Sequence, residues 1–295
     1  MSERSNVLAD VTVAMPTADD DPKLVAAAID AALAAGLAHP LVIVDSSQTD
    51  GVRAVAAQRA DSVRYVAEQH AVSAARNRLL ELADTRYVVF LDADALPEPG
   101  WAAALRRAFD ALPDIAVVGA RCVPIWQGRH PRLFATRIAG DYLSLFDLGD
   151  APLDVPRVMG TSYAIDVERC GPAPFPQDVP GRRPSDEVML CLAAHAAGWR
   201  IRYEPRAVVG HHIQAPQSAS AAFRPGRASP PGAPAATWRG MMRRVYAAGR
   251  ESVYGPQHLE PLPRRLSFDD RLFRAMIAPA FVTGQLAARY ARMRR

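Results

Sequence analysis

The fold of this chain is decided by the stretch Tyr87-Val88-Val89-Phe90-Leu91-Asp92-Ala93-Asp94-Ala95. Its first five residues are apolar and strand-forming, which is typical of a fully buried strand in a parallel sheet. An unpaired carboxylate is costly in such an interior, so we expect Asp92 and Asp94 at the carboxyl end of the strand. Open α/β sheets bind ligands at that edge, and carboxylates there suit Mg²⁺ or Mn²⁺ carrying a phosphate. A turn rich in Asp is the alternative interpretation of this D-x-D pattern.

The composition is ordinary for a soluble globular enzyme, with 49% hydrophobic and 22% charged residues. A length of 295 residues allows one large domain, or one domain with an appendage. Three widely spaced cysteines give neither a zinc site nor a disulfide framework and favour a reducing compartment. The polar N-terminus has no signal core, and no apolar run reaches the length of roughly 18 residues that a bilayer requires. The sequence therefore predicts a cytoplasmic protein.

Strand-like and helix-like segments alternate along the first 120 residues, which predicts a mostly parallel α/β sheet flanked by helices. The strands are expected at residues 11–15, 41–44, 62–66, 87–91, 115–119, 159–165 and 201–203. The helices are expected at residues 22–37, 50–59, 73–83, 105–112 and 187–197. Beyond them, residues 214–236 are dense in Pro, Ser, Ala and Gly and predict a linker or mobile loop.

The net charge of +4 is unevenly distributed. Residues 261–295 hold eight arginines against two aspartates, so the basic character belongs to a helical C-terminal extension predicted at 237–295. Aromatic rings are not interleaved with these cations as in a single-strand binding groove, so nucleic acid is not expected as a partner. Residues 268–277 form an amphipathic pattern with two open interpretations. This helix either packs on the core or lies on an anionic membrane as a peripheral contact.

Six motifs, taken in order, resemble glycosyltransferase family 2. They are V-A-M-P-T (13–17), V-D-S-S-Q-T-D-G (44–51), S-A-A-R-N (73–77), F-L-D-A-D-A (90–95), S-D-E-V-M-L (185–190) and G-W-R-I-R-Y-E-P-x-A-V-V-x-H (198–211). The resemblance implies a GT-A fold (the Rossmann-like fold of nucleotide-diphospho-sugar transferases) over residues 1–213. The donor half would span about residues 10–120 and the acceptor half about 121–213. It also implies inverting transfer of a single sugar from a nucleotide-sugar donor.

The resemblance assigns the donor and metal sites residue by residue. Contacts to the donor nucleotide would come from Pro16, Thr17, Asp45, Arg76, Asp92 and Ala93. A divalent cation, Mn²⁺ or Mg²⁺, would be held by Asp94 and His211, although the neighbouring His212 fits that position too. Alternatives from the residues alone stay open: Asp45 as a turn residue or helix cap, and Arg76 in a surface ion pair.

The acceptor side depends on the acidic pair Asp186-Glu187, which the family usually shows in the order Glu-Asp. The resemblance implies that one of the two is the general base; alignment on G-W favours Glu187, and Asp186 stays open. First-turn acids that favour the helix dipole are the alternative. Acceptor contacts are expected from Gly160, Thr161 and Trp126, and Trp101 is a weaker candidate for sugar contact.

Departures from the family pattern limit these expectations. Ser46 stands where a second acid is common, which leaves the nucleotide base open. The acceptor is equally open between a small molecule, a glycan, a lipid-linked molecule and a peptide. Two rival functions remain: a nucleotidyltransferase, against which the acidic, Gly-free segment 18–21 argues, and a non-catalytic nucleotide- or sugar-binding homologue, which the reversed acidic pair leaves open.

Overall fold

The computed structural model describes residues 8–126, 145–176 and 185–213. The chain divides into two compact units, and all of these residues except Trp126 and Ile213 belong to the first. That unit comprises residues 1–125, 144–178 and 185–212. The linker predicted at 214–236 and the extension predicted at 237–295 lie outside the described residues, and the domain boundary at 213 stays a prediction.

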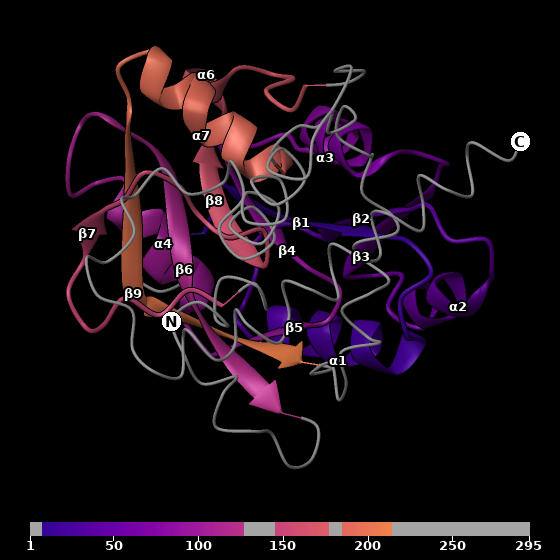
Figure 1. Ribbon diagram of the computed structural model, residues 1–295. Helices are drawn as coiled ribbons and strands as arrows, with labels where there is room; N and C mark the ends of the chain where they lie inside the picture. Colours follow the sequence, from indigo (N-terminus) through magenta and orange to yellow (C-terminus); the bar gives the residue numbers. More distant parts are fainter. Residues whose placement is uncertain (1–7, 127–144, 177–184, 214–295) are drawn as a thin grey trace, which may run out of the picture. The chain divides into compact units, whose positions relative to one another are not determined.

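The centre of the first unit is one mixed sheet (Figure 1). Its described strands follow the order β3-β2-β1-β4-β8-β6-β9-β5, with β7 paired to β9. The strands are β1 (Val11–Thr17), β2 (Leu41–Asp45), β3 (Val63–Ala67), β4 (Tyr87–Leu91), β5 (Ala95–Pro97), β6 (Ile115–Trp126), β7 (Leu153–Asp154), β8 (Ser162–Asp166) and β9 (Arg200–Ile213). Strands β1 to β4 are parallel to one another, whereas β8 is antiparallel to β4 and β6, and β9 is antiparallel to β5 and β7. The parallel part matches the prediction, and the antiparallel part was not foreseen.

Helices cover both sides of the parallel strands. They are α1 (Pro22–Leu33), α2 (Gly51–Ala57), α3 (Val72–Leu82), α4 (Trp101–Ala108), α6 (Val167–Cys170) and α7 (Asp186–Ala196). Figure 1 shows α1 and α2 on one side and α3 and α7 on the other. Right-handed β-α-β crossovers between the parallel strands require that α3 lies on the side opposite to α1 and α2. Helices α3 and α7 therefore share a side, although about a hundred residues separate them. Across the described ranges, no helix combines the length and the apolar character that crossing a membrane would need.

Local sequence explains these elements. All five residues of β2 and of β4 are buried, because both strands have neighbours on each edge and helices on each side. Helix α1 begins after Asp21, whose side chain accepts a hydrogen bond from the Lys23 amide, and Pro22 occupies the first turn. Its apolar stripe, formed by Val25, Ala28, Ile29 and Ala32, packs into the core.

Several predicted boundaries were wrong. The helix predicted at 105–112 runs over Trp101–Ala108, because Gly100 at φ 84° starts it and the Trp101 ring is buried in the core. The strand predicted at 159–165 begins only at Ser162. Strands β6 and β9 extend well past their predicted ends, and β5, β7 and α6 had no clear sequence signal.

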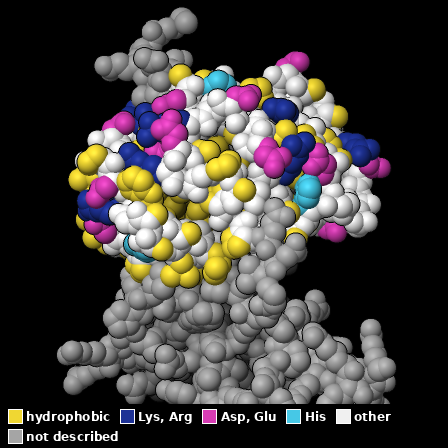
Figure 2. Space-filling view, turned by 90° about the horizontal axis from the view of Figure 1, so that it is seen from above, with side chains coloured by type: hydrophobic (Ala, Val, Ile, Leu, Met, Phe, Trp, Pro, Cys, Tyr) yellow, Lys and Arg dark blue, Asp and Glu magenta, His cyan; other side chains and the backbone are white. Residues whose placement is uncertain are grey.

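On the face of the molecule that Figure 2 shows, the described charged side chains lie in mixed groups rather than in a field of one sign. Figure 2, which views the side of α3 and α7, shows basic side chains next to acidic ones over the described part of this face. Ion pairs such as Arg78 with Glu68 and Glu81 account for this mixing. Pairs of this exposed kind contribute little to stability.

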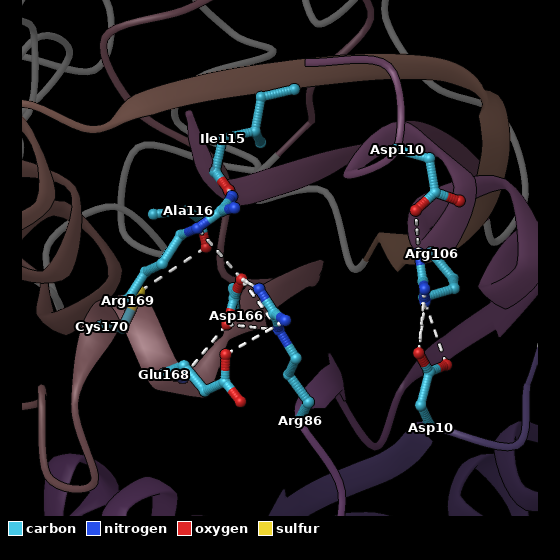
Figure 3. A network of polar contacts seen from close by, with 10 residues as sticks. All are labelled: Asp10, Arg86, Arg106, Asp110, Ile115, Ala116, Asp166, Glu168, Arg169 and Cys170. Atoms are coloured by element: carbon cyan, nitrogen blue, oxygen red, sulfur yellow. Dashed lines mark hydrogen bonds and ion pairs between the residues drawn. The ribbon is translucent and has the colours of Figure 1, made fainter. Parts of the chain in front are cut away.

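The edge of the sheet where β1 and β4 begin and β8 ends carries a separate ion-pair network (Figure 3). Arg106 binds Asp10 at 2.9 Å and Asp110 at 2.7 Å, and its guanidinium lies 4.2 Å from the centre of the Tyr87 ring. Nearby, Arg86 binds the fully buried Asp166 at 2.8 Å. Each guanidinium here is neutralised by acids of the same edge, so this network holds the sheet together at the end opposite to the D-x-D.

Candidate functional site

Polar side chains predicted from the sequence meet at the carboxyl edge of the parallel strands. Thr17 and Asp45 end β1 and β2 in register with each other, and Asp92 follows the end of β4. Asp45 and Thr17 are buried, at 3% and 5% exposure. Pro16 lies one residue before Thr17 and pairs with Val44 of β2. This is the edge at which open α/β sheets accept ligands.

Asp45 is fixed in place by two donors. The Tyr65 hydroxyl of β3 donates to Asp45 Oδ2 at 2.7 Å, and the Ser47 amide donates to Oδ1 at 2.8 Å. The Ser47 bond is the contact that the interpretation of Asp45 as a turn residue predicts. The interpretation of Asp45 as a helix cap is wrong, because Asp50 occupies the N-cap of α2. The Asp45 carboxylate is thus rigidly placed at the strand end.

Ser46 links two loops at this edge. Its hydroxyl donates to the Glu68 carbonyl at 2.9 Å and accepts from the His70 amide at 3.1 Å, and its own amide donates to the Thr17 carbonyl. The loops after β1, β2 and β3 are therefore tied together. Ser46 acts here as a structural link between strand ends.

The D-x-D is held from both sides by backbone hydrogen bonds. The Asp92 amide donates to the Thr161 carbonyl at 3.0 Å, and the His212 amide donates to the Asp94 carbonyl at 3.2 Å. Ala93, between the two acids, is buried at 4% exposure. Pairing of β5 with β9 places His211 opposite Ala95, one residue past the D-x-D. The motif and His211 are thereby brought together from segments more than a hundred residues apart.

Asp94 and His211 form the pair that fits a divalent cation. Asp94 Oδ1 lies 3.3 Å from His211 Nε2, and the Asp94 side chain is 36% exposed. A carboxylate oxygen and an imidazole nitrogen on an open face suit Mn²⁺, with further positions left for phosphate oxygens and water. Among the described residues, no group of three His, Cys, Asp or Glu side chains is arranged to hold a metal ion. The residues present fit a cation that shares its coordination with a substrate.

Asp92 lies between the metal pair and the acids of α7. Burial raises its pKa to about 7, and the Asp94 carboxylate adds to this rise, whereas Arg76 and His211 oppose it. Its side chain is 32% exposed, so solvent moderates the effect. A carboxylate in this environment is stabilised by any cation that binds beside it.

Arg76, on α3, is buried at 4% exposure at the centre of these acids. Its Nη1 lies 2.6 Å from Asp186 Oδ2 and 3.9 Å from Glu187 Oε2, and its Nη2 lies 3.5 Å from Asp92 Oδ1. The interpretation of Arg76 as part of a surface ion pair is therefore wrong. Burial by itself would lower the pKa of Arg76, but its anionic surroundings leave that pKa raised.

Asp186 and Glu187 begin α7 in different environments. Asp186 is the direct partner of Arg76, whereas Glu187 Oε1 accepts a 2.5 Å hydrogen bond from the Ser185 hydroxyl. Burial raises the pKa of Glu187, while Arg76 and the Ser185 bond oppose the rise and Asp186 adds to it. The two acids are thus unequal: Asp186 is bound to a buried cation, and Glu187 has a carboxyl group whose pKa is raised by burial.

Gly160 borders the same acids. A β-carbon at this position would lie 3.5 Å from Arg76 Nη2 and 3.7 Å from Glu187 Cδ. Thr161 is fully buried and is used by the backbone bond to Asp92. Trp126 ends β6 within the second compact unit, and its acceptor role stays a prediction.

Trp101 is not a sugar contact. Its ring is fully buried, and its indole N–H donates to the Ser162 hydroxyl at 3.0 Å.

Three contributors were missed by sequence reasoning. Tyr65 holds Asp45, and nothing in a strand sequence distinguishes it from a packing tyrosine. Ser185 holds Glu187, although a Ser directly before two acids is a recognisable helix-start signal. Tyr163 lies with its ring 5.7 Å from the Arg76 guanidinium, and its buried hydroxyl has no partner among the described residues.

Residues 12–159 match the protein family described as glycosyl transferase family 2, which is half of the chain. The match includes Asp45, Arg76, Asp92 and Asp94, and ends before the acidic pair of α7. Among curated proteins, the chain is similar to the pre-mycofactocin glycosyltransferases of two Mycobacterium tuberculosis strains, at 34% identity over 143 residues. That similarity covers 47% of this chain and 29% of those relatives, so the chain spans less than a third of their length.

Solved structures with the same fold include two glycosyltransferases. One is the mannosyltransferase PcManGT of Pyrobaculum calidifontis in complex with GDP-Man and Mn²⁺, with a TM-score of 0.52 and 22% identity, covering 96% of this chain and 74% of that one. The other is GalNAc-T7 with UDP, GalNAc and Mn²⁺, with a TM-score of 0.54 and 14% identity, covering 90% of this chain and 53% of that one. These likenesses show that the fold is GT-A.

Proposed function

Because this chain belongs to glycosyl transferase family 2, we propose that it transfers a single sugar, with inversion, from a nucleotide-sugar donor to an acceptor hydroxyl or similar nucleophile. One observation supports this best: Asp92 of the D-x-D and both acids of the pair 186–187 lie within 4 Å of the buried guanidinium of Arg76. An inverting transfer needs a site for the leaving diphosphate close to a carboxylate that takes the acceptor proton. The chain offers both within one cluster.

The donor would bind along the carboxyl edge of β1, β2 and β4. Thr17 and Asp45 would contact the nucleoside, and Pro16 and Ala93, which lie at or next to the same strand ends, would border it. Asp94 and His211 would hold Mn²⁺ or Mg²⁺, which supplies positive charge to the departing nucleoside diphosphate when bound. Both structural relatives named above were solved with Mn²⁺ and a nucleotide, which agrees with this assignment.

Glu187 is proposed as the general base. Its carboxylate removes the proton of the acceptor hydroxyl while the acceptor oxygen forms a bond to the anomeric carbon. The bond between that carbon and the diphosphate oxygen breaks, and its electron pair leaves with the nucleoside diphosphate. A base works best when its pKa is close to the working pH, and burial shifts the pKa of Glu187 upward in that direction.

Asp186 is less suited to that role because its carboxylate already pairs with Arg76 at 2.6 Å. A buried carboxylate that takes up a proton would give up this charge-assisted bond. In the order Asp-Glu, the first acid, Asp186, pairs with Arg76, and the second acid, Glu187, is the proposed base.

A thermal-shift panel tests the proposal. UDP, GDP, dTDP, their sugars and the corresponding nucleoside triphosphates are each added with and without Mn²⁺, because a ligand that binds only the native state raises the apparent stability. A metal-dependent shift with one nucleoside diphosphate is the expected result and identifies the donor base. A shift with nucleoside triphosphates instead would favour a nucleotidyltransferase. Donor binding without release of diphosphate on incubation with any acceptor class would favour a non-catalytic homologue.

A further inference from the structure

Arg76 has an environment that a simple donor ligand does not need. Its guanidinium is buried by Tyr163 of β8 on one side and by Gly160 near Nη2. The carboxylates that it contacts come from two places in the chain, α7 and the end of β4. An arginine that faced only a diphosphate would be expected to keep its fork toward the open edge of the sheet.

We infer that Arg76 is a positioning residue that holds Asp92 of the donor side and Asp186 of the acceptor side with one guanidinium fork, leaving Glu187 as the acid that takes the acceptor proton. This inference rests on the proposed function and replaces the expectation that Arg76 contacts the donor nucleotide directly. Arginine suits this task because its planar fork presents separate N–H donors to two acids, as Nη1 and Nη2 do here.

The arrangement also sets the position of the base. Asp186 and Glu187 are adjacent on the first turn of α7, so the 2.6 Å bond from Arg76 to Asp186 fixes the turn on which Glu187 stands. Ser185 then orients the Glu187 carboxyl from the other side. Glu187 itself lies 3.9 Å from Nη1, close enough to feel the cation without forming a hydrogen bond of normal length.

The test variant is Arg76→Lys. An ammonium keeps the charge but is a point donor on a flexible stem, so it reaches Asp186 or Asp92 and not both. Arg76→Ala is unsuitable, because it leaves Asp186 buried without a cation. Arg106→Lys is the matched control, since Arg106 also bridges two acids beside a tyrosine ring but does so at the opposite edge of the sheet.

Two measurements with ligands distinguish a positioning role of Arg76 from a role as donor ligand. Calorimetry with UDP or GDP plus Mn²⁺ measures donor-side affinity, and release of nucleoside diphosphate from the matching nucleotide sugar in water measures turnover. We expect Arg76→Lys to keep affinity within about threefold and to lose turnover by about tenfold or more, as displaced catalytic groups do. The Arg106→Lys control should change neither. Weakened affinity with unchanged turnover of bound donor would overturn the inference and make Arg76 a donor ligand.

A third readout needs no ligand. The groups facing Glu187 are Ser185 at the N-cap of α7, Asp186 and Cys191 on α7, Arg76 on α3, Tyr163 on β8 and Asp92 after β4. In Arg76→Lys the cation is no longer fixed beside Glu187, so the pKa of Glu187 should rise further. The fall in Tm that accompanies ionisation of Glu187 should therefore occur at a higher pH than in the wild type. That movement should be absent in the Glu187→Gln background. If the dependence of Tm on pH is the same in Arg76→Lys as in the wild type, the inference is overturned, whether or not the wild type binds a donor. If the wild type binds no donor, only the proposed function is refuted.

Discussion

Replacing Glu187 by glutamine tests the proposed base with the least disturbance of the structure. Glutamine has the same shape, and its amide oxygen still accepts the hydrogen bond from Ser185. Asp186 keeps its 2.6 Å bond to Arg76, so the buried charge pair of the site stays complete. The change therefore removes one property, the ability to take up a proton.

The expected loss follows from that property. General-base catalysis contributes about 10²–10⁴-fold, equivalent to roughly 3–5 kcal/mol of barrier, and we expect turnover to fall by that factor. Affinity for the nucleoside diphosphate with Mn²⁺ should stay within about twofold, because Glu187 lies on the acceptor side. Diphosphate release from the nucleotide sugar, followed at saturating donor, measures the first quantity, and calorimetry measures the second.

Stability gives an independent check, because the pKa of Glu187 is raised in the folded state. A raised carboxyl pKa contributes stability that is present below the ordinary value of 4.5 and is lost as pH rises through the folded-state pKa. Glutamine has no such loss, so Tm of the variant relative to wild type should increase between acidic and neutral pH. Turnover within about twofold of wild type would refute Glu187 as base, and a constant Tm difference would refute its perturbed environment.

Three further substitutions test other parts of the site. Asp94→Asn should abolish the Mn²⁺ dependence of nucleotide affinity, and an unchanged metal dependence in calorimetry would contradict the metal pair. Tyr65→Phe removes the 2.7 Å bond that holds Asp45, so donor affinity should fall by about three- to tenfold with turnover of bound donor unchanged. Trp101→Phe leaves the Ser162 hydroxyl without its buried donor and should lower the free energy of unfolding by about 1–3 kcal/mol, measured by urea titration. A loss of sugar affinity without destabilisation would restore Trp101 as a sugar contact.

The parallel half of the fold could be predicted because its signals are local. Apolar runs such as 41–44 and 87–91 are long enough to identify strands, and the residues between them have helical character. Strand direction carries no such local signal. Nothing in Ser162–Asp166 indicates that β8 enters antiparallel to β4, since both strands are simply buried on both faces. The antiparallel half therefore had to come from the structure.

The site residues also divide into those that local sequence signals predict and those that depend on contacts between distant segments. That Asp45 and Asp92 lie at one edge follows from parallel strand direction alone. The bond between Arg76 and Asp186 joins residues 110 positions apart on two helices, and no periodicity relates them. Sequence reasoning consequently placed Arg76 on the correct helix and assigned it to the donor nucleotide, whereas in the structure its guanidinium contacts the carboxylates of Asp92 and Asp186.

The reversed acidic pair, which seemed to weaken the case for catalysis, becomes intelligible from this geometry. Two carboxylates side by side on a buried first turn repel each other, so a cation beside one of them lowers the cost of burying the pair. Asp186 has that cation at 2.6 Å, and Glu187 is 3.9 Å away from it with a carboxyl pKa raised by burial. The longer glutamate side chain stands at the position whose carboxyl forms no hydrogen bond of normal length to Arg76. The order Asp-Glu is therefore compatible with the same division of roles between a fixed acid and a proton acceptor.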